Sequence, residues 1–472
     1  MLPYSNGLLL GETTDEHGDR ARLYLENPER AAHLYVIGST GAGKSKALAS
    51  WACADLQAGY AFGVLDPHGD LIADILQNAT AWPLLRLIEF GSEEMVTINP
   101  LEPIPGIDIF TQTVELVDVF RKVWELSEES SPRLLEILRN SLWTLIEAGE
   151  TLLELEPLLT NKGFRERLIK HVTDEPVARF WRDRFERWPE RERTLYVEST
   201  LNKASSFTAD PRLRLMLGAK TSTINFREVM DKGQILLVDL SKGVLRTNTN
   251  LIGALLLSRI QMAAISRLSL PPDKRSPWHL YVDEFQNFAT DSFAEMLSEA
   301  RKMGLRLILA HQTLGQLPEK LRSTVLGNAR SFVVFRCDRL DAELLARYVT
   351  DVEPGMVRYM DTEHAPSYEP LSDQWERAAS ELAALPLREA VLRTKGLRAR
   401  RFRTLDFPTD SEVSISQREH LRNFGRGRGW LRYCRDLDQE LAIRSAGLTQ
   451  ASSTGSEPIE PSSYWESTRG SD

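Results

Sequence analysis

The segment at residues 38–45 constrains this chain more than any other part of it. It reads Gly-Ser-Thr-Gly-Ala-Gly-Lys-Ser and fits the pattern G-x-x-x-x-G-K-[ST]. An apolar β-type segment at 33–37 precedes it, and a run of helix-forming residues at 46–54 follows it. Strand, glycine-rich loop and helix in this order indicate a loop whose backbone N–H groups surround phosphate oxygens at a helix N-terminus. An ordinary glycine-rich turn is the alternative.

The pattern assigns a separate task to each fixed residue of the loop. Lys44 is expected to reach the β- and γ-phosphates of a nucleoside triphosphate, and the Ser45 hydroxyl is expected to hold Mg²⁺. We therefore predict ATP and Mg²⁺ as cofactors. The residues predicted to bind the nucleotide are Gly38, Ser39, Thr40, Gly41, Ala42, Gly43, Lys44 and Ser45.

The composition is that of a globular protein with two or three domains. The 472 residues are 42% apolar and 26% charged. A net charge of −9 argues against a uniformly basic coat for nucleic acid, although a local basic patch or channel is compatible with it. The longest apolar run, at 251–265, is short for a membrane span and is interrupted by polar residues. Three cysteines without paired spacing suit a reducing cytoplasm and argue against a structural zinc site.

Short apolar segments alternate with helical patterns along much of the chain. Continuous apolar strands of this kind indicate a mainly parallel sheet that is covered on both faces, so the predicted fold class is α/β. Between about 110 and 220 the pattern is helical throughout. The predicted domains are an N-terminal β-hairpin (1–30), a nucleotide-binding domain in two parts (31–109 and 221–411), an all-α insertion (110–220) and a polar, partly disordered C-terminal tail (412–472).

A pair of acids follows one of the predicted strands. Asp283 and Glu284 end the apolar segment 279–282. Hydrolysis needs a carboxylate that organises the metal ion and a group that positions water, so Asp283 is predicted to act on Mg²⁺ and Glu284 on the attacking water. A strand followed by an acidic turn is the simpler interpretation. Gln312 ends the next strand and is predicted to sense the γ-phosphate, with a plain loop residue as the alternative.

Arg301 precedes that strand at the end of a predicted helix. A cation there can simply complement the negative end of the helix dipole. In a ring of subunits it can instead reach the γ-phosphate held by the neighbouring subunit.

Together these motifs resemble the HerA/FtsK branch of P-loop motor ATPases. Within that branch the chain is most similar to the conjugative coupling proteins of type IV secretion, the VirD4/TraG/TrwB-like family, over roughly residues 30–410. The segments that carry the resemblance are 38–45, 66–70 (Asp-Pro-His-Gly-Asp), 239–241 (Asp-Leu-Ser), 282–285 (Val-Asp-Glu-Phe), 301–304 (Arg-Lys-Met-Gly), 310–312 (Ala-His-Gln) and 327–329 (Gly-Asn-Ala).

The resemblance implies a RecA-like fold and a ring motor that moves DNA at the expense of ATP. It implies Lys44 and Ser45 for phosphate and Mg²⁺, Asp283 with Glu284 as the acidic pair, Gln312 as the sensor and Arg301 as an arginine finger acting in trans. The partners that it implies are single- or double-stranded DNA, other copies of the chain in a homo-hexamer, and a relaxosome-like complex.

The family's membrane-bound members begin with transmembrane helices, and we read no such segment here. We therefore expect a soluble relative in the cytoplasm, or a protein that docks at the inner membrane onto a separate membrane or secretion subunit. This departure bears on the secretion role more than on the motor role.

Two basic segments are candidates for DNA contact. Lys242 and Arg246 lie in the loop after the strand 234–239, and a denser basic run at 388–403 includes Arg398, Arg400 and Arg401. Cations in such places can follow a phosphate backbone without reading sequence. The alternative for the loop is an ordinary surface loop, and the alternative for the run is a solvated face or pairing with acidic neighbours in the ring.

The predicted function is an ATP-driven DNA translocase of the coupling-protein type. A VirB4-like assembly ATPase that does not transport DNA is the second hypothesis. A scaffold for defence or regulation, whose assembly nucleotide controls, is the third.

Overall fold

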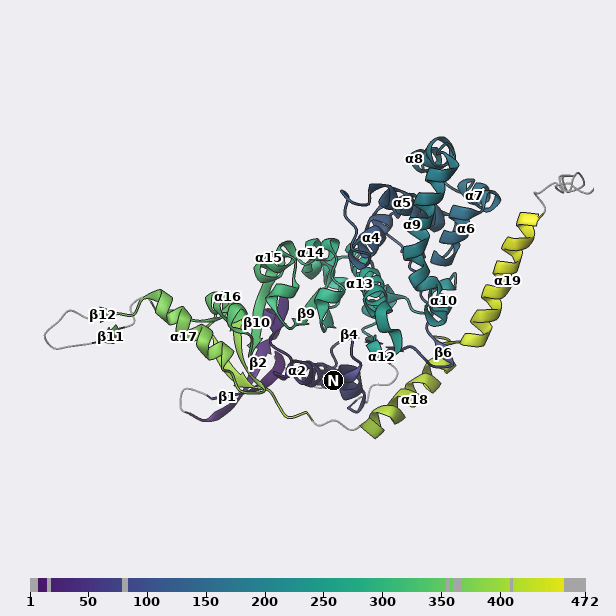
Figure 1. Cartoon of the computed structure of the whole chain (residues 1–472). Helices are drawn as coiled ribbons and strands as arrows, with labels where there is room; N and C mark the ends of the chain where they lie inside the picture. Colours follow the sequence, from purple (N-terminus) through teal and green to yellow (C-terminus); the bar gives the residue numbers. More distant parts are fainter. Residues whose placement is uncertain are drawn as a thin grey trace, which may run out of the picture. The chain divides into compact units, whose positions relative to one another are not determined.

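The computed structural model describes residues 7–14, 18–78, 84–353, 357–359, 367–407 and 411–453 (Figure 1). These residues form two compact units. The first comprises the chain up to Val96, Pro103–Ser127 and Thr223–Arg432. The second comprises Thr97–Glu102, Glu128–Ser222 and the chain from Tyr433.

The first unit is built on one eleven-stranded sheet with the order β2-β1-β14-β13-β10-β3-β9-β8-β4-β7-β5. From β10 to β5 every neighbouring pair is parallel, whereas the strands from β2 to β13 pair antiparallel. The bounds of the strands are β1 (Gly7–Thr14), β2 (Arg20–Glu26), β3 (His33–Ile37), β4 (Phe62–Asp66), β5 (Leu85–Ile88), β7 (Ile235–Asp239), β8 (Trp278–Val282), β9 (Leu305–His311), β10 (Ala329–Phe335), β13 (Glu389–Thr394) and β14 (Arg400–Arg403). The predicted α/β fold with a mainly parallel sheet is confirmed.

Helices cover both faces of the parallel strands. In Figure 1, α2 lies below the strands, and α13, α14 and α15 lie above them. The helices of this unit are α1 (Asn27–Arg30), α2 (Lys44–Ala58), α3 (Asp70–Leu76), α4 (Ile109–Val123), α11 (Phe226–Asp231), α12 (Lys242–Leu245), α13 (Thr249–Ser266), α14 (Asp291–Met296), α15 (Glu319–Asn328), α16 (Arg339–Val349), α17 (Leu371–Ala383) and α18 (Ser411–Gly427). Short strands β6 (Glu94–Met95), β11 (Val357–Tyr359), β12 (Ser367–Tyr368) and β15 (Arg432–Tyr433) lie outside the large sheet.

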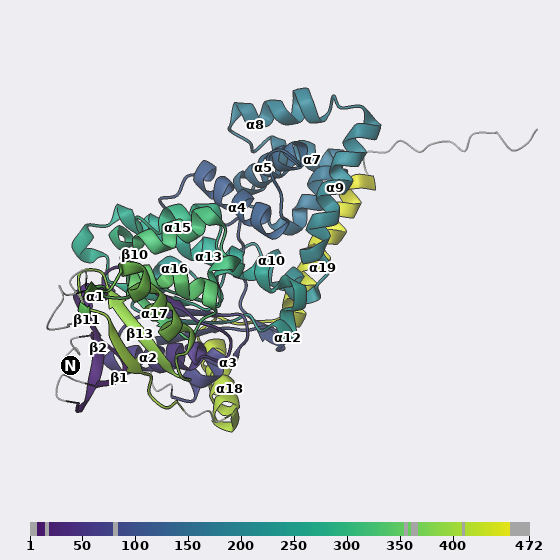
Figure 2. The ribbon, with the colours of Figure 1, turned by 60° about the vertical axis from the view of Figure 1, so that its left-hand side comes forward.

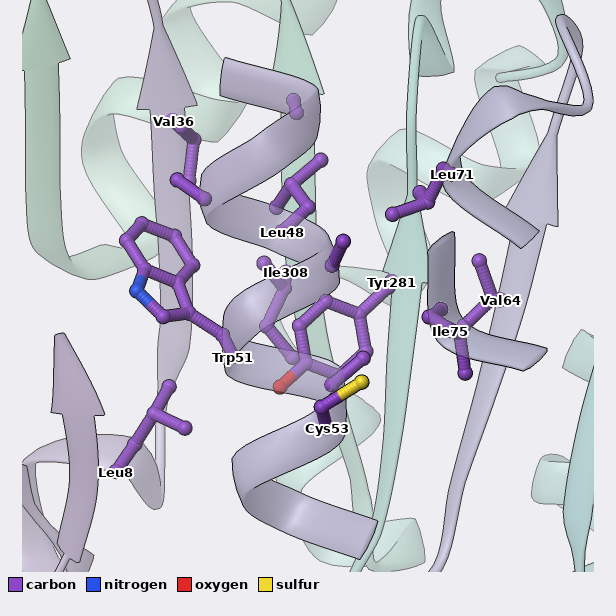
Figure 3. Packing of buried hydrophobic residues seen from close by; sticks show 14 of the residues in the cluster. Leu8, Val36, Leu48, Trp51, Cys53, Val64, Leu71, Ile75, Tyr281 and Ile308 are labelled. Carbon is purple, nitrogen blue, oxygen red and sulfur yellow. The ribbon is translucent and has the colours of Figure 1, made fainter. Parts of the chain in front are cut away.

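The core explains why the central strands are apolar without alternation. Figure 3 shows Leu48 and Trp51 of α2 packed near Val36 of β3 and Ile308 of β9 on one face of the sheet. Because successive side chains of a strand point to opposite faces, the next set of β3 residues, His33, Tyr35 and Ile37, is buried on the other face. Both faces therefore require apolar residues.

Helix α13 is buried on nearly all sides, which explains why it is mostly apolar and shows no polar face. The stretch Thr249–Ser269 is long and apolar enough to cross a membrane by length and composition, with a mean hydropathy of 1.4. However, 89% of its most apolar window is buried inside the protein. That burial is characteristic of a core helix.

The predicted N-terminal hairpin is present and is part of the large sheet. β1 pairs with β2 on one side and with β14 on the other, so the hairpin extends the antiparallel edge (Figure 2). β14 lies inside the basic run at 388–403, where the density of charge concealed a strand from the sequence analysis. Its alternate residue Phe402 is buried in the core.

The predicted polar tail from 412 is wrong in its first part. Residues Ser411–Gly427 form α18, and Cys434–Ser453 form α19 in the second unit. Helix α18 packs on α3 and β5, where it buries Leu421. Three arginines spaced four residues apart also hold the helix by ion pairs: Arg418 and Arg422 pair with Glu89, and Arg426 pairs with Glu94. These charged residues made the segment polar in sequence, which is why it resembled a tail. The part of the predicted tail at 454–472 lies outside the described residues.

Apart from its loops and Tyr433 of β15, the described part of the second unit is helical, as predicted for the insertion. Its helices are α5 (Pro132–Glu147), α6 (Leu155–Thr160), α7 (Lys162–Ile169), α8 (Glu175–Arg179), a π-helical turn (Phe180–Phe185), α9 (Glu190–Thr208), α10 (Pro211–Gly218) and α19. The boundary predicted at 110 differs from the structure, because α4 belongs to the first unit. Helix α4 packs against α13, which is distant in sequence.

A buried carboxylate joins α4 to α13. Glu115 accepts hydrogen bonds from Gln261 Nε2 (3.0 Å) and from the Ser292 hydroxyl (2.9 Å). Burial raises the pKa of Glu115 to about 7, with Asp118 adding repulsion and the Ser292 hydrogen bond opposing the rise. The folded protein therefore binds a proton more tightly than the unfolded chain does.

This proton makes stability depend on pH. A raised folded-state pKa contributes stability that is complete below about pH 4.5 and is lost as the pH rises through 7. We expect Glu115→Gln to remove this dependence, which amounts to at most about 3 kcal/mol. The measurement is the melting temperature between pH 5 and pH 8, with Glu299→Gln, which changes an exposed carboxylate, as the control. Equal pH dependence in wild type and Glu115→Gln would contradict the assignment.

Candidate active site

The loop at 38–45 joins the end of β3 to the start of α2. Gly41 and Gly43 adopt φ angles of +75° and +104°, which residues with side chains rarely adopt. At Gly43 a Cβ atom would also lie 3.2 Å from Cγ of Arg388. The curled backbone therefore depends on glycine at these positions, as phosphate binding by N–H groups requires.

Lys44 and Ser45 begin α2. The Lys44 side chain is buried and donates to the carbonyl oxygen of Gly38 at 2.5 Å, so it folds back over its own loop. Burial lowers the pKa of Lys44, and the nearby Glu284 and Asp283 partly oppose this. An anion in the loop would be a stronger partner for the ammonium group than a carbonyl.

Asp283 and Glu284 follow β8, as predicted. The Ser45 hydroxyl donates to Asp283 Oδ2 at 3.2 Å, so the two predicted Mg²⁺ residues are brought together across 238 positions of sequence. Burial raises the pKa of Asp283 to about 7, and repulsion from Glu284 and Asp66 adds to the rise while Lys44 opposes it. A cation between Ser45 and Asp283 would offset the repulsion among these carboxylates and favour the ionised form of Asp283.

Gln312 connects the acidic pair to the loop. Its Nε2 donates to Glu284 Oε1 at 2.9 Å, and its Oε1 accepts from the Thr40 hydroxyl at 2.9 Å. Thr40 belongs to the phosphate loop, so one amide spans the distance from the loop to the predicted base. Sequence reasoning placed Gln312 near the γ-phosphate, and the contact with Thr40 is consistent with that placement.

The order of strands explains this convergence. β3 lies beside β9, and β9 lies beside β8, all parallel. The phosphate loop, Gln312 and the acidic pair follow the carboxyl ends of these three neighbouring strands. Parallel strands bring their carboxyl ends to one edge of the sheet, which is where ligands bind in open α/β folds.

The residues present fit a magnesium-bound nucleoside triphosphate. The glycine-rich loop supplies backbone N–H groups, and Lys44 supplies a buried ammonium group. The Ser45 hydroxyl and the Asp283 carboxylate are oxygen ligands of the kind that Mg²⁺ prefers. Glu284 lies next to them with its backbone in the left-handed region at φ 48°. Strained backbone at a non-glycine residue is typical of functional sites.

Arg301 is not part of this assembly within one chain. It is exposed in a 3-10 helix, Ala300–Met303, that precedes β9. Because Gln312 follows the other end of β9, the strand's length of roughly 20 Å separates them. The helix predicted to end near Arg301 is also interrupted, since α14 ends at Met296. Arg301 therefore does not reach a phosphate held in the loop of its own chain.

The candidate DNA contacts are dispersed. Arg246 is exposed with φ 52° after α12, while the Lys242 side chain lies outside the part of the chain that the structure describes. Arg398 and Arg400 are exposed near β14. Arg401 is also exposed but pairs with Glu389 of the same chain at 2.6 Å.

Sequence reasoning missed two residues at the site. The Arg388 N–H donates to the carbonyl oxygen of Ala42 at 3.1 Å, and its backbone has φ 70°. Gln286 Nε2 donates to Glu284 Oε2 at 2.7 Å. No motif signals Arg388, whose contact joins parts of the chain far apart in sequence. Gln286 stands two residues after Glu284, so the sequence shows that the two residues are close. It does not show that the Gln286 side chain points toward the Glu284 carboxylate.

Comparison with known proteins supports the fold resemblance. Residues 277–371 match a family model described as the TraM recognition site of TraD and TraG. No match is found among curated proteins. The matched region contains the acidic pair, Gln312 and Arg301.

Several solved structures share the fold over most of the chain. The bacterial conjugative coupling protein TrwB, in an unbound form, is 18% identical with a TM-score of 0.59, covering 81% of this chain and 87% of that chain. TrwB in complex with ADP and Mg²⁺ is 18% identical with a TM-score of 0.58, covering 83% and 89%. VirB4 of Thermoanaerobacter pseudethanolicus is 14% identical with a TM-score of 0.55, covering 86% and 98%. The predicted RecA-like coupling-protein fold is confirmed.

Proposed function

We propose that this protein is an ATPase that moves DNA, a ring motor of the coupling-protein type. The observation that carries the proposal is the chain of hydrogen bonds that joins Ser45, Asp283, Glu284 and Gln312 at the carboxyl edge of the sheet, next to the buried Lys44. The shared fold with TrwB, whose structures hold ADP with Mg²⁺ and nucleotide analogues, supports ATP and Mg²⁺ as the ligands.

The chain's own residues divide the work of hydrolysis. Loop N–H groups and Lys44 would bind and orient the phosphates, and Ser45 with Asp283 would hold a metal ion, which would supply charge stabilisation. Glu284 accepts a proton from the attacking water. Gln312 Nε2 keeps one N–H on Glu284 Oε1 and would offer its second N–H to the terminal phosphate, and so report whether that phosphate is present.

The position of Arg301 supports an oligomeric site. An exposed arginine far from the loop of its own chain is useful if it reaches the phosphate held by a neighbouring subunit, and a homo-hexameric ring would repeat this contact.

We further propose that the segment 277–371 carries a surface for a relaxosome-type partner, since the matching model describes TraM recognition in TraD and TraG. We place this activity in the cytoplasm, with a separate membrane or secretion subunit as its attachment.

A secretion assembly ATPase is the second candidate. The match to VirB4, which covers 98% of that chain, favours it. It predicts ATP turnover that is indifferent to DNA and tight binding to secretion components.

The test is ATP turnover measured without DNA, with single-stranded DNA and with double-stranded DNA, alongside the mass of the assembly with nucleotide. The proposal predicts that at least one form of DNA raises turnover and that the active species is oligomeric. Turnover that DNA leaves unchanged would favour the VirB4-like function. A protein with no turnover under any condition would contradict both.

The exposed cations make a separate contribution to DNA affinity. We expect the double variant Arg398→Ala/Arg400→Ala to weaken binding to every sequence and to reduce the salt slope of log K by about 2, since each phosphate contact contributes about 1. We expect Arg246→Ala to reduce the same salt slope by about 1. The measurement is DNA affinity by fluorescence anisotropy across a salt series. Arg339→Ala, an exposed arginine paired with Glu343 on α16, is the control. Unchanged slopes would remove these residues from the DNA path.

A further inference from the structure

Two glutamine amides hold the carboxylate of Glu284 from opposite ends. Oε1 accepts from Gln312 Nε2 at 2.9 Å, and Oε2 accepts from Gln286 Nε2 at 2.7 Å. Glu284 is buried, so few rotamers are open to it and each hydrogen bond fixes one oxygen. The resemblance predicted Gln312, but it assigned nothing to Gln286.

Gln286 donates a hydrogen bond to Glu284 but, within the described part of the chain, leaves its own amide oxygen without a partner. It lies in the 3-10 helix Phe285–Asn287, it is 8% exposed, and its Oε1 is buried with no hydrogen-bond partner among the described residues. Because an ionised carboxylate only accepts hydrogen bonds, the amide must turn its nitrogen toward Glu284 and leave its oxygen unpaired. A buried acceptor without a partner costs free energy. Such a cost at a functional site indicates a role other than stability.

The two amides differ in what else they touch. Gln312 also binds Thr40 of the phosphate loop, so a ligand in that loop can change its position. Gln286 follows Glu284 on the same short turn, so the two residues move together. The Gln312 amide is thus connected to the phosphate loop, whereas the Gln286 amide supports the Glu284 carboxylate.

We propose that Gln286 is a positioning residue for Glu284. It fixes Oε2, so that Oε1 stays directed to the strand-β9 side, where Gln312 and the attacking water are expected. Gln312 then reports the phosphate to a carboxylate whose orientation is already set. This inference rests on the proposed ATPase function for its catalytic meaning, but the geometric claim about the carboxylate stands independently of turnover.

The first test is structural. A crystal structure of nucleotide-free Gln286→Met is expected to show that Glu284 has left hydrogen-bond distance of Gln312 Nε2. Methionine has a similar length and volume but no donor, so packing is preserved while the hydrogen bond is lost. A Glu284 carboxylate unchanged in position would overturn the proposal whether or not the protein hydrolyses ATP.

The second test separates binding from catalysis. We expect Gln286→Met to lower kcat by about tenfold or more, because misplacement of a catalytic group by about 1 Å can cost as much as 10²-fold. KM and the Kd for ADP should stay within about threefold of wild type, since the hydrogen bond that Gln286 donates goes to Glu284 and not to the loop. In a Glu284→Gln background the same change should cost nothing further, because its effect acts through that carboxylate. A full additional loss in that background would overturn the proposal.

The chain offers a matched control. Gln261, which is 2% exposed, donates to the buried Glu115, so Gln261→Met removes the same kind of hydrogen bond away from the strand ends. We expect it to lower the melting temperature without lowering kcat. If it lowers kcat as much as Gln286→Met does, the loss reflects stability and the proposal is wrong.

A second variant covers the case in which Gln286→Met fails to fold. Gln286→Asn keeps the amide but withdraws it by one methylene, and we expect the same displacement of Glu284 and the same fall in kcat. A folded Gln286→Asn with wild-type kcat and an unmoved Glu284 would overturn the proposal. If wild type shows no ATP turnover, the proposed function fails, and the position of Glu284 in the two variants still decides this inference.

Discussion

Glu284→Gln is expected to bind ATP as wild type does and to lose ATP turnover by a factor of about 10²–10⁴, the usual contribution of a general base. The amide keeps the size of the side chain and can still accept a hydrogen bond from one of its two glutamine neighbours. It cannot take a proton from water. Turnover would be measured by phosphate release, and binding by a fluorescent nucleotide.

The control for this variant is Glu299→Gln. Glu299 is exposed and pairs with Lys302 at 3.3 Å, so its amide should leave both binding and turnover within about twofold of wild type, as is usual for surface changes. Rapid hydrolysis by Glu284→Gln would remove Glu284 from its assigned role. Loss of nucleotide binding would show that the residue supports the loop instead.

Mixing two inactive variants should restore activity if Arg301 acts on the neighbouring subunit. Arg301→Ala alone is expected to reduce turnover by about 10³-fold, since an arginine finger contributes about 10³–10⁵. Lys44→Ala alone is expected to lose phosphate binding. In a mixed ring, a Lys44→Ala subunit still presents Arg301 to an intact loop in an Arg301→Ala subunit, so some sites are complete. The measurement is turnover in rings whose mixed composition is verified by mass spectrometry.

Lys302→Ala is the matched control for Arg301→Ala. The two residues are adjacent and exposed in the same 3-10 helix, but Lys302 pairs with Glu299. We expect Lys302→Ala to keep turnover near the wild-type level. An absence of rescue in verified mixed rings would count against a shared site, and full activity of Arg301→Ala would exclude the finger.

The sequence predicted the core of the fold because the physical signals are local. Strand β3, the loop at 38–45 and α2 are contiguous, so apolar pattern, glycine spacing and helix propensity all lie within a short segment. The acidic pair after β8 and Gln312 after β9 follow apolar strands in the same way. Parallel strands bring their carboxyl ends together, which is why the separate motifs could be assigned to one site.

Elements whose stability comes from distant partners were harder to predict. Helix α18 is polar, and its sequence is typical of a tail until Glu89 and Glu94 are seen to pair with its arginines. Strand β14 was concealed by its arginines because only Phe402 faces the core. Helix α4 was grouped with the insertion because its partner α13 is remote in sequence.

By itself, the sequence determined the nucleotide loop, the acidic pair and the mainly parallel sheet, since each depends on residue types at fixed local spacing. Only the tertiary structure decided what these residues do to one another. It placed Gln312 between Thr40 and Glu284, brought Gln286 to the second oxygen of that carboxylate, and separated Arg301 from the loop by the length of a strand. The reason is physical: a hydrogen bond depends on distance and direction in space, and spacing along the chain specifies neither.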